Sequence, residues 1–551
     1  MKKKMIALTL AAMMTVASLA GCGNTGSTSS DTTAAGETAG TTATEEVQKT
    51  EVVGKDVEAA TELSDNEIKV GFGTAIDSLT PFRAQTARNA PYFVQLYETL
   101  AVLDENQELQ PYVAKSWETS DNGFTYDVEI WDTVSDSEGN KITAADVVWF
   151  INESMTRALK PIFAKISSVE QTGDYTFKLT LNSNVVGTIE AIFQDTYIVS
   201  QTAFETSSDE FGSKAVTTSP YVCTEFTPSA SLSFERRDDY WQDIANLPEC
   251  VRPVQKKVSY SIITEASQLG IALETGEIDM AIDMASSTGT QFVNNSDYTV
   301  SLQDGPQGWQ LFFSGAESRV VADNEKLRQA ICYAIDADGL VSGLSQGYGT
   351  PMYDVASPRL IGFNEEWKNE DYYSYDIEKA QELLKESGYS GETLTILGTS
   401  SASSSRLGQL VQNYLVAIGI NVELNSVDMA LYTASRLDGT QYDMVLGTVG
   451  GSYLPDFWSI RFDPASYPAG DATSRNDEEL AELLYKTWTV DGYTEENINE
   501  VHNYIKEHAY GYGLVNPQVF SIWRNDLNMV KEVDGGISGY VVPSACQIRG
   551  N

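Results

Sequence analysis

A short Gly/Ser segment, Gly343–Gly347, matches the G-x-S-x-G pattern of a nucleophile elbow. In that motif a strand leads into the serine and a helix follows it, which leaves the hydroxyl exposed on a tight turn. Here the segment follows a helical pattern and Asp338-Gly339, and we expect it to be a loop. The sequence therefore does not support Ser345 as a nucleophile, and a cell-surface hydrolase is retained only as an alternative.

The sequence lacks the residue patterns that usually bind metals or cofactors. The two histidines, His502 and His508, are six positions apart, whereas a helix brings together residues three or four apart. The run Asp336-Ala337-Asp338-Gly339 lacks the third acid and the bidentate Glu of a calcium loop. Neither a P-loop nor a dinucleotide fingerprint is present. We expect no enzyme, no metal site and no cofactor.

Length and charge narrow the class of protein. A chain of 551 residues suggests roughly three domains, at about 150 residues each. The formal net charge of −42 argues against nucleic acid, whose phosphates need Lys and Arg. Because the acids are spread along the chain, they indicate a solvated surface; an acidic patch for cationic ligands is the alternative.

Four cysteines beyond residue 22 show no CxxC spacing, so neither zinc nor a redox pair is indicated. They are Cys223, Cys250, Cys332 and Cys546. A Cys223–Cys250 disulfide stays open, since the N-terminus indicates export.

That N-terminus has the layout of a leader. Lys2-Lys3-Lys4 precedes an apolar stretch from Met5 to Leu19, which is too short to span a membrane comfortably. The ending Leu19-Ala20-Gly21-Cys22 resembles a bacterial lipobox, which implies a lipoprotein signal peptide over 1–22 and lipidation of Cys22. The alternative is an ordinary leader cut near Ala20-Gly21. Residues 23–64 are rich in Thr, Ser, Gly and Ala, and we expect a flexible tether with an end-to-end distance of roughly 36 Å.

The middle of the chain carries a strand followed by a capped helix. The run 309–313 is apolar and predicts a buried strand, and Asp323 or Asn324 can cap the helix that follows. The helix has one apolar face, formed by Leu327, Ala330, Ile331, Ala334 and Ile335, and ends at 336–339. Further along, strand 394–397, a helix from Leu407 to Ile418 and strand 421–424 predict a βαβ unit. In residues 175–181 apolar and polar side chains alternate strictly, which predicts a half-buried strand. Earlier in the chain, Thr143 is expected to cap the helix that begins directly after it.

Several of these segments match, in order and spacing, one known family. The run 323–336, the turn Asp77-Ser78-Leu79-Thr80-Pro81, and the pair Ala114-Lys115-Ser116-Trp117 and Thr143–Val147 resemble the family 5 extracellular solute-binding proteins. That family contains the peptide-binding components of ABC importers. The resemblance runs, with gaps, from Ile68 to the C-terminus. The departures are small: Ser219 replaces the usual Gly before Pro220-Tyr221, and only Tyr240-Trp241 remain of an N-x-x-Y-W motif.

The resemblance implies an α/β, two-lobed periplasmic-binding-protein-like fold of type II, with an extra inserted domain and a ligand cleft between the lobes. Lobe I would comprise residues 65–105, 216–308 and 515–551, the inserted domain 106–215, and lobe II 309–514. Strand 309–313 is expected to cross between the lobes, and the chain to return near 515–517.

The function implied is capture of an oligopeptide or a related small solute for an ABC importer, with no reaction catalysed. The partners would be the solute, a membrane permease and, through the lipid anchor, the membrane. The protein would be a monomer on the outer face of the cell membrane, on its extracellular or periplasmic side. An oligosaccharide-binding member, or a peptide-pheromone receptor without a transport role, are the alternatives.

The residues expected to line the cleft are Gln85, Arg88, Trp309, Phe313, Arg436, Gly450, Gly451, Ser452 and Tyr453. In peptide-binding members, the loop after the strand matching 442–446 carries an aspartate that pairs with the free α-amine of the peptide. That position holds Ser452 here, and a usual tryptophan position holds Val449. Asp456 would take over if the loop folds differently. Otherwise the resemblance implies a ligand not chosen by a free α-amine: a blocked or long peptide, or a non-peptide.

Overall fold

A computed structural model describes residues 63–548 except 84–88, 104–107, 121–122, 306–307, 449–452, 464–472, 474–475, 490, 532 and 534–540. The expected leader, with Cys22, and residues 23–62 of the expected tether lie outside the described residues, as do Gln85, Arg88, Gly450, Gly451 and Ser452. The last two tether residues, Leu63 and Ser64, are described, and the Ser64 N–H donates a 2.9 Å hydrogen bond to the Val254 carbonyl, so the tether ends before them. Within the described part, the helices are too short or too polar to cross a membrane.

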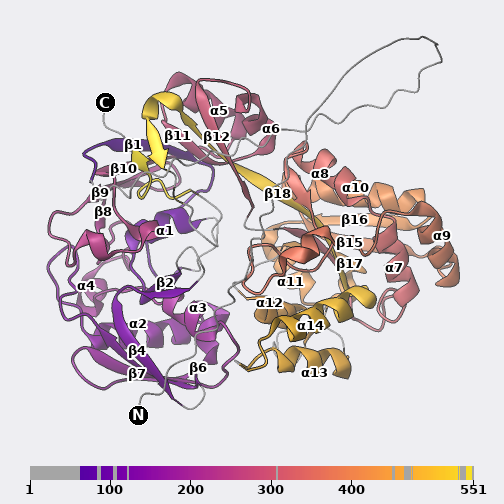
Figure 1. Ribbon diagram of the computed structural model, residues 1–551, viewed down its shortest axis with the longest axis horizontal. Helices are drawn as coiled ribbons and strands as arrows, with labels where there is room; N and C mark the ends of the chain where they lie inside the picture. Colours follow the sequence, from indigo (N-terminus) through magenta and orange to yellow (C-terminus); the bar gives the residue numbers. More distant parts are fainter. Residues whose placement is uncertain are drawn as a thin grey trace, which may run out of the picture. The chain divides into compact units, whose positions relative to one another are not determined.

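The described residues contain a large mixed sheet of twelve strands (Figure 1). Its order is β16 (Asn421–Val427), β15 (Thr393–Thr399), β17 (Met444–Thr448), β13 (Trp309–Phe313), β18 (Gly511–Arg524), β11 (Met280–Met284), β1 (Glu67–Phe72), β10 (Lys257–Ile262), β9 (Ser231–Arg236) and β8 (Tyr221–Thr227). Two further strands, β12 (Tyr298–Asp304) and β14 (Gly349–Pro351), also pair with β18.

The strand β18 belongs to both parts of this sheet. Its first residues pair with β13 and β14, whereas from Gln518 onward it pairs with β12 and β11. We call β1, β8–β12 and the end of β18 the first sheet half, and β13–β17 with the start of β18 the second sheet half. The strand expected to cross, β13, pairs with β17 and with the start of β18. The strand β13 itself therefore does not cross; the chain passes between the halves just before it, after β12. The expected return near 515–517 falls where β18, whose ladder runs through both halves, changes partners.

Local patterns in the second half formed as expected. The parallel strands β15 and β16 flank α10 (Ala402–Ala417), so the βαβ unit is confirmed. The helix α7 (Glu325–Tyr333) begins at Asn324, whose side chain accepts a 3.1 Å hydrogen bond from the Leu327 N–H. At the expected end of this helix, Asp336 instead caps a second helix, α8 (Ala337–Ser345).

The G-x-S-x-G segment is therefore partly helical, not the expected loop. Ser345 is the last residue of α8, is buried, and donates a 2.9 Å hydrogen bond to the Val341 carbonyl. Its hydroxyl is tied to its own helix.

A separate antiparallel sheet of four strands runs β4 (Ala114–Ser120), β5 (Thr125–Ile130), β7 (Thr176–Leu181) and β6 (Ile166–Gln171). Along β7, alternate residues are buried, as the sequence predicts. Before it lies α2 (Ala144–Thr156), where the Asp146 carboxylate accepts a 2.8 Å hydrogen bond from the Thr143 N–H.

The remaining helices are α1 (Ala90–Leu96), α3 (Thr188–Asp195), α4 (Gln201–Thr206), α5 (Ala266–Thr275), α6 (Ser286–Gly289), α9 (Ile377–Glu386), α11 (Met429–Arg436), α12 (Leu454–Phe462), α13 (Glu478–Lys486) and α14 (Glu495–Glu507). Two small ladders join β2 (Ala101–Leu103) with β3 (Leu109–Pro111), and β19 (Met529–Lys531) with β20 (Gln547–Ile548).

The cores follow the sheets. The four-stranded sheet shares one hydrophobic cluster with the first sheet half, which includes Val70, Phe150 and Phe177. In the second half, β13 separates two clusters: Leu311 and Phe313 pack on one face, and Phe312 packs on the other.

Arg328 of α7 ties this helix to the start of β18. Its guanidinium is 3% exposed and donates to the carbonyls of Val321 and Ala322 at 2.9 and 2.8 Å, and to those of His508 and Ala509 at 2.9 and 3.2 Å. The Tyr510 ring lies 5.2 Å away. A buried cation is stable only when it is well hydrogen-bonded, so this position requires an arginine fork.

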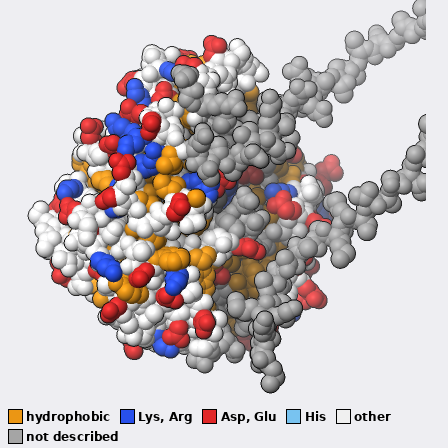
Figure 2. All heavy atoms as spheres, turned by 60° about the vertical axis from the view of Figure 1, so that its left-hand side comes forward, with side chains coloured by type: hydrophobic (Ala, Val, Ile, Leu, Met, Phe, Trp, Pro, Cys, Tyr) orange, Lys and Arg blue, Asp and Glu red, His pale blue; other side chains and the backbone are white. Residues whose placement is uncertain are grey.

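The described cysteines are free thiols: Cys223 and Cys250 are half-buried, and Cys332 and Cys546 are buried. The disulfide left open by the sequence is not formed. On the surface, acidic side chains are scattered among Lys and Arg over the face shown in Figure 2, in keeping with a solvated acidic surface.

The buried His502 predicts a pH-dependent stability. Its ring stacks on Trp367 at 3.9 Å, and burial, together with the charge of Lys506, lowers the pKa of His502 to about 3. In the unfolded chain this imidazole takes up a proton near pH 6.5, so the free energy of unfolding falls as the pH drops below that value. His502→Phe should remove about 2 kcal/mol of the wild-type loss between pH 7 and pH 5. Urea unfolding at both pH values tests this, and equal losses in the two proteins would refute the buried neutral histidine.

Candidate functional site

Trp309 lies where the two sheet halves meet. It is half-buried at the start of β13 and is in register with Thr448 of β17 and Val515 of β18. Thr448 immediately precedes the segment 449–452, so the structure brings Trp309 close to the start of the loop that the sequence marks for ligand contact.

Phe313 is not available to a ligand. Four residues along β13 from Trp309, its side chain is fully buried in the core of the second half, opposite Met444. The expectation that Phe313 lines a cleft was wrong, because β13 is covered on both faces.

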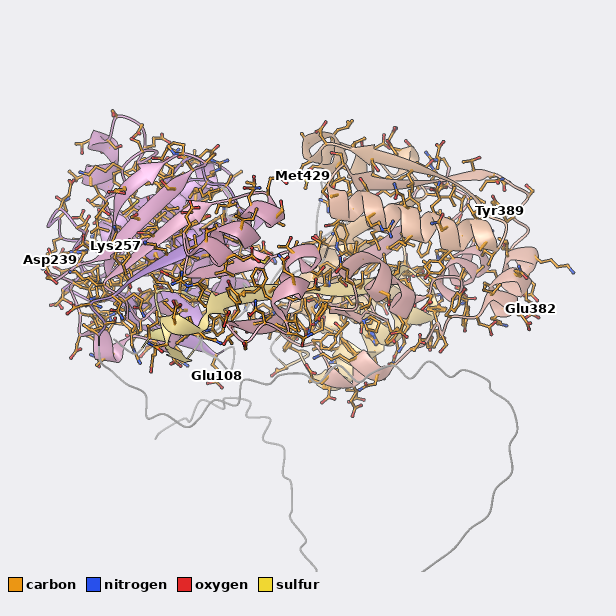
Figure 3. The ribbon with its side chains drawn as sticks, turned by 90° about the horizontal axis from the view of Figure 1, so that it is seen from above. Glu108, Asp239, Lys257, Glu382, Tyr389 and Met429 are labelled. Atoms are coloured by element: carbon orange, nitrogen blue, oxygen red, sulfur yellow. The ribbon has the colours of Figure 1, made fainter. Side chains whose placement is uncertain are left out.

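Arg436 ends α11 and is half-buried, and its carbonyl accepts a 2.9 Å hydrogen bond from the Tyr442 hydroxyl. None of the residues of α11 is buried. Its apolar side chains Met429 and Leu431 are 65% and 50% exposed, and Met429 is labelled in Figure 3. This helix therefore presents apolar surface beside one of the expected ligand residues.

Tyr453 precedes α12 and is 7% exposed. Its ring covers Gly187, where an added Cβ would lie 2.1 Å from the ring. Burial raises the pKa of Tyr453, and so does the neighbouring carboxylate of Glu190, which is itself half-buried. The sequence marked Tyr453 as a cleft residue, but the structure brings it against the segment before α3.

Two polar contacts accompany this packing. Lys165, at the end of the 3-10 helix Pro161–Lys165, forms a 2.8 Å ion pair with Asp456 in the first turn of α12. The Val186 N–H donates a 3.2 Å hydrogen bond to the Trp488 carbonyl. We call this group the α3–α12 contact; its members are Lys165, Val186 and Gly187 on one side and Tyr453, Asp456 and Trp488 on the other. Apart from Tyr453 and Asp456, sequence reasoning missed these residues, because nothing in a local pattern pairs positions some 300 residues apart.

The chain segments that pass between the halves are tightly packed. A Cβ on Gly305 would lie 2.4 Å from the Pro517 carbonyl oxygen, and one on Gly349 would lie 2.9 Å from that of Asn516. Arg359 donates a 2.7 Å hydrogen bond to the carbonyl of Asp304, the last residue of β12. The carboxamide of Asn516 is fully buried and has no hydrogen-bond partner within the described part of the chain.

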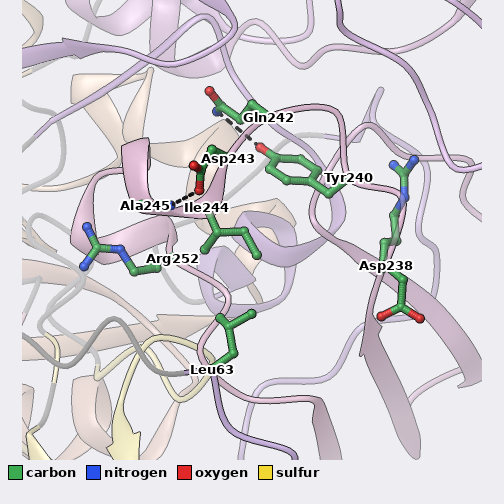
Figure 4. Close-up of a pocket in the computed structure, with 9 residues that line it drawn as sticks. Leu63, Asp238, Tyr240, Gln242, Asp243, Ile244, Ala245 and Arg252 are labelled. Carbon is green, nitrogen blue, oxygen red and sulfur yellow. Dashed lines mark hydrogen bonds between the residues drawn. The ribbon is translucent and has the colours of Figure 1, made fainter.

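A cavity of about 330 Å³ lies on the first sheet half (Figure 4). It is lined by Leu63, Arg237, Asp238, Tyr240, Gln242, Asp243, Ile244, Ala245 and Arg252. The expected cleft residues that the structure describes lie elsewhere. The charged side chains of the cavity are of both signs, so it favours neither a cationic nor an anionic ligand.

The Tyr240-Trp241 pair beside this cavity has a structural role. The Tyr240 hydroxyl and the Trp241 indole N–H, the latter at 2.9 Å, both donate to the carboxyl of buried Glu98. Burial raises the pKa of Glu98 to about 7 despite these bonds. The two aromatics thus satisfy a buried acid, which accounts for this part of the sequence motif.

The two histidines have separate partners. His502 stacks on Trp367, whereas His508 Nδ1 lies 2.7 Å from a Glu325 carboxylate oxygen. Among the described residues, no three His, Cys, Asp or Glu side chains are grouped so as to hold a metal ion.

Comparison with known proteins shows which family this chain resembles in sequence and fold. The model of the bacterial extracellular solute-binding proteins, family 5 middle, matches residues 108–468. The glutathione-binding protein GsiB of Escherichia coli K12 is 26% identical over 441 residues, which cover 76% of this chain and 83% of GsiB.

Two solved structures share the fold. DppA of Helicobacter pylori, an ABC transporter-associated periplasmic binding protein in complex with peptide STSA, has a TM-score of 0.71 at 21% identity and covers 87% of this chain and 98% of its own. NikZ of Campylobacter jejuni, in complex with Ni(L-His), has a TM-score of 0.68 at 19% identity and covers 87% of this chain and 100% of its own. Because the family model spans well over half of its residues, this chain belongs to family 5 of the bacterial extracellular solute-binding proteins.

Proposed function

We propose that this protein captures an oligopeptide or a related small solute outside the cell and delivers it to an ABC importer, without catalysing a reaction. The observation that carries the proposal is the pair of sheet halves joined along β18, in a chain of this family. Halves that share a strand can rotate about it and enclose a solute. The peptide in DppA and the name of GsiB support a peptide-type ligand.

We assign the two sheet halves to two lobes. Lobe I would comprise 65–105, 216–308 and 515–551, with 106–215 as the inserted domain, and lobe II 309–514. The solute would lie between the lobes, in contact with Trp309, Arg436 and Tyr453. Gln85, Arg88 and the segment 450–452 are proposed from the sequence alone, and Phe313 is withdrawn because it is buried.

Native mass spectrometry of the purified protein identifies the ligand directly. A solute released from the intact protein on denaturation, with a mass that fits a peptide, would support the proposal. A non-peptide solute would change the ligand class.

Solute binding should close the lobes. The recovered solute, added to protein stripped of it, should reduce the radius of gyration in small-angle X-ray scattering. At about 100 times Kd it should also add about 2.7 kcal/mol to the free energy of unfolding by mass action. Tight binding with an unchanged radius of gyration would contradict closure.

The pairing of Asp456 bears on how a peptide would be held. The position expected for the amine-binding aspartate holds Ser452, and Asp456 was the carboxylate nearest in sequence that could replace it. Asp456 is already paired with Lys165 at 2.8 Å. A hydrogen bond to a charged group contributes roughly 1.5–3 kcal/mol, about ten- to a hundred-fold in affinity, and serine supplies no charge. We infer a ligand that is not chosen by a free α-amine.

N-acetylation of the ligand peptide should therefore change its affinity by less than about tenfold. Calorimetry with one peptide in free and acetylated forms measures this, and the Asp456→Asn variant, titrated in parallel, should give the same ratio. A loss of a hundredfold on acetylation would mean that a carboxylate reads the amine.

The anchor is proposed from Leu19-Ala20-Gly21-Cys22. Cys22→Ala should move the protein from the membrane fraction to the medium or periplasm, because one residue carrying several acyl chains supplies the stable attachment. Fractionation followed by immunoblotting checks it, with Cys223→Ala as the matched control that stays with the membrane. A Cys22→Ala protein that remains in the membrane fraction would exclude lipidation there. We also propose that the protein is a monomer.

A further inference from the structure

The α3–α12 contact joins residues on the two sides of β18 without being part of the large sheet. Lys165, Val186 and Gly187 belong to the segments that flank the four-stranded sheet, whose core is continuous with that of the first sheet half. Tyr453 and Asp456 belong to α12 and the residue before it, whose core lies with β13 and β17 of the second half. Figure 1 labels both α3 and α12.

The geometry of this contact is specific. Gly187 has φ +91°, a left-handed conformation that favours glycine, and the Tyr453 ring occupies the space that any side chain there would need. Lys165 and Asp456 are only 20% and 30% exposed, so their 2.8 Å pairing is partly shielded from water. The Val186 to Trp488 hydrogen bond links the two backbones directly.

The contact is also small. It includes one ion pair, one backbone hydrogen bond and one aromatic ring on a glycine, each of which is individually weak in water. Such a contact can open and re-form while each half keeps its own core.

We propose that the α3–α12 contact is a latch that holds the two halves together around the solute and opens for the solute to enter or leave. The proposal rests on the proposed solute capture. It also gives the four-stranded sheet a role, because the segments that flank this sheet carry one side of the latch. Asp456 then serves closure, which leaves it unavailable as a ligand for the amine of a peptide.

Gly187→Asn tests the latch by occupying the space of the Tyr453 ring. Asparagine tolerates a positive φ, so the backbone penalty is modest. Gly139→Asn is the matched control, because Gly139 has φ +83° and a Cβ there meets no described atom within 4 Å. Solute-free protein exchanges between open and latched states, and solute adds to the latched state. In solute-free protein, Gly187→Asn should therefore shift this exchange to the open state and increase the radius of gyration measured by small-angle scattering, whereas Gly139→Asn should leave it at the wild-type value. Equal values for the two variants would overturn the proposal.

A charge-reversal cycle tests the same latch without touching Gly187. Lys165→Glu or Asp456→Lys alone should place like charges together and speed hydrogen exchange of the Val186 amide at least tenfold. The double variant should restore the wild-type rate. Val186 is distant in sequence from both substitutions, so its intrinsic exchange rate is unchanged. If the single variants exchange at the wild-type rate, or the double variant does not recover, the latch is refuted.

Both measurements use protein without solute. Their failure would leave solute capture standing, whereas failure of native mass spectrometry to find a solute bears on capture alone.

Discussion

The backbone hydrogen bonds of β18 join the two sheet halves, and the other contacts between the halves depend on them. One strand of 14 residues serves two sets of partners: β13 and β14 up to Pro517, and β12 and β11 from Gln518 onward. Arg328 fixes where this strand starts, because its guanidinium holds the carbonyls of His508 and Ala509, just before Gly511. No carboxylate among the described residues is hydrogen-bonded to this guanidinium, so carbonyl oxygens and the Tyr510 ring offset the cost of its burial.

At the change of partners, the packing leaves little room and one polar group unsatisfied. The approach of Gly305 to the Pro517 carbonyl excludes a side chain at residue 305. The Asn516 carboxamide is buried without a partner among the described residues, and such a group costs about 1–3 kcal/mol. Asn516 lies where the β18 ladder passes from one half to the other. Any rotation between the halves therefore changes the surroundings of its unsatisfied carboxamide.

Much of the fold could be predicted from the sequence because its signals are local. The Asn324 cap of α7, the βαβ unit around α10 and the alternation along β7 each depend on residues a few positions apart. Strand pairing is not local, and for that reason β13 was expected to cross although it pairs within the second half. The return near 515–517 was expected, but not that a single strand, β18, pairs with both halves there. Phe313 was wrongly expected to line the cleft, because a strand buried on both faces shows no alternation of apolar and polar residues that would mark an exposed position. No sequence pattern marks the latch residues Lys165 and Gly187, because their partners, Asp456 and Tyr453, lie far along the chain.

The free thiols have a consequence for how the folded domain responds to oxidants. No disulfide bond joins Cys223, Cys250, Cys332 or Cys546 among the described residues, so packing and hydrogen bonds hold the described fold together. Burial raises the pKa of Cys223 to about 12 and that of Cys332 higher still, so at neutral pH neither thiol supplies the thiolate that reacts with oxidants or with other cysteines. At neutral pH Cys223 and Cys332 therefore stay inert toward oxidants, whether or not the surrounding envelope holds a disulfide-forming system.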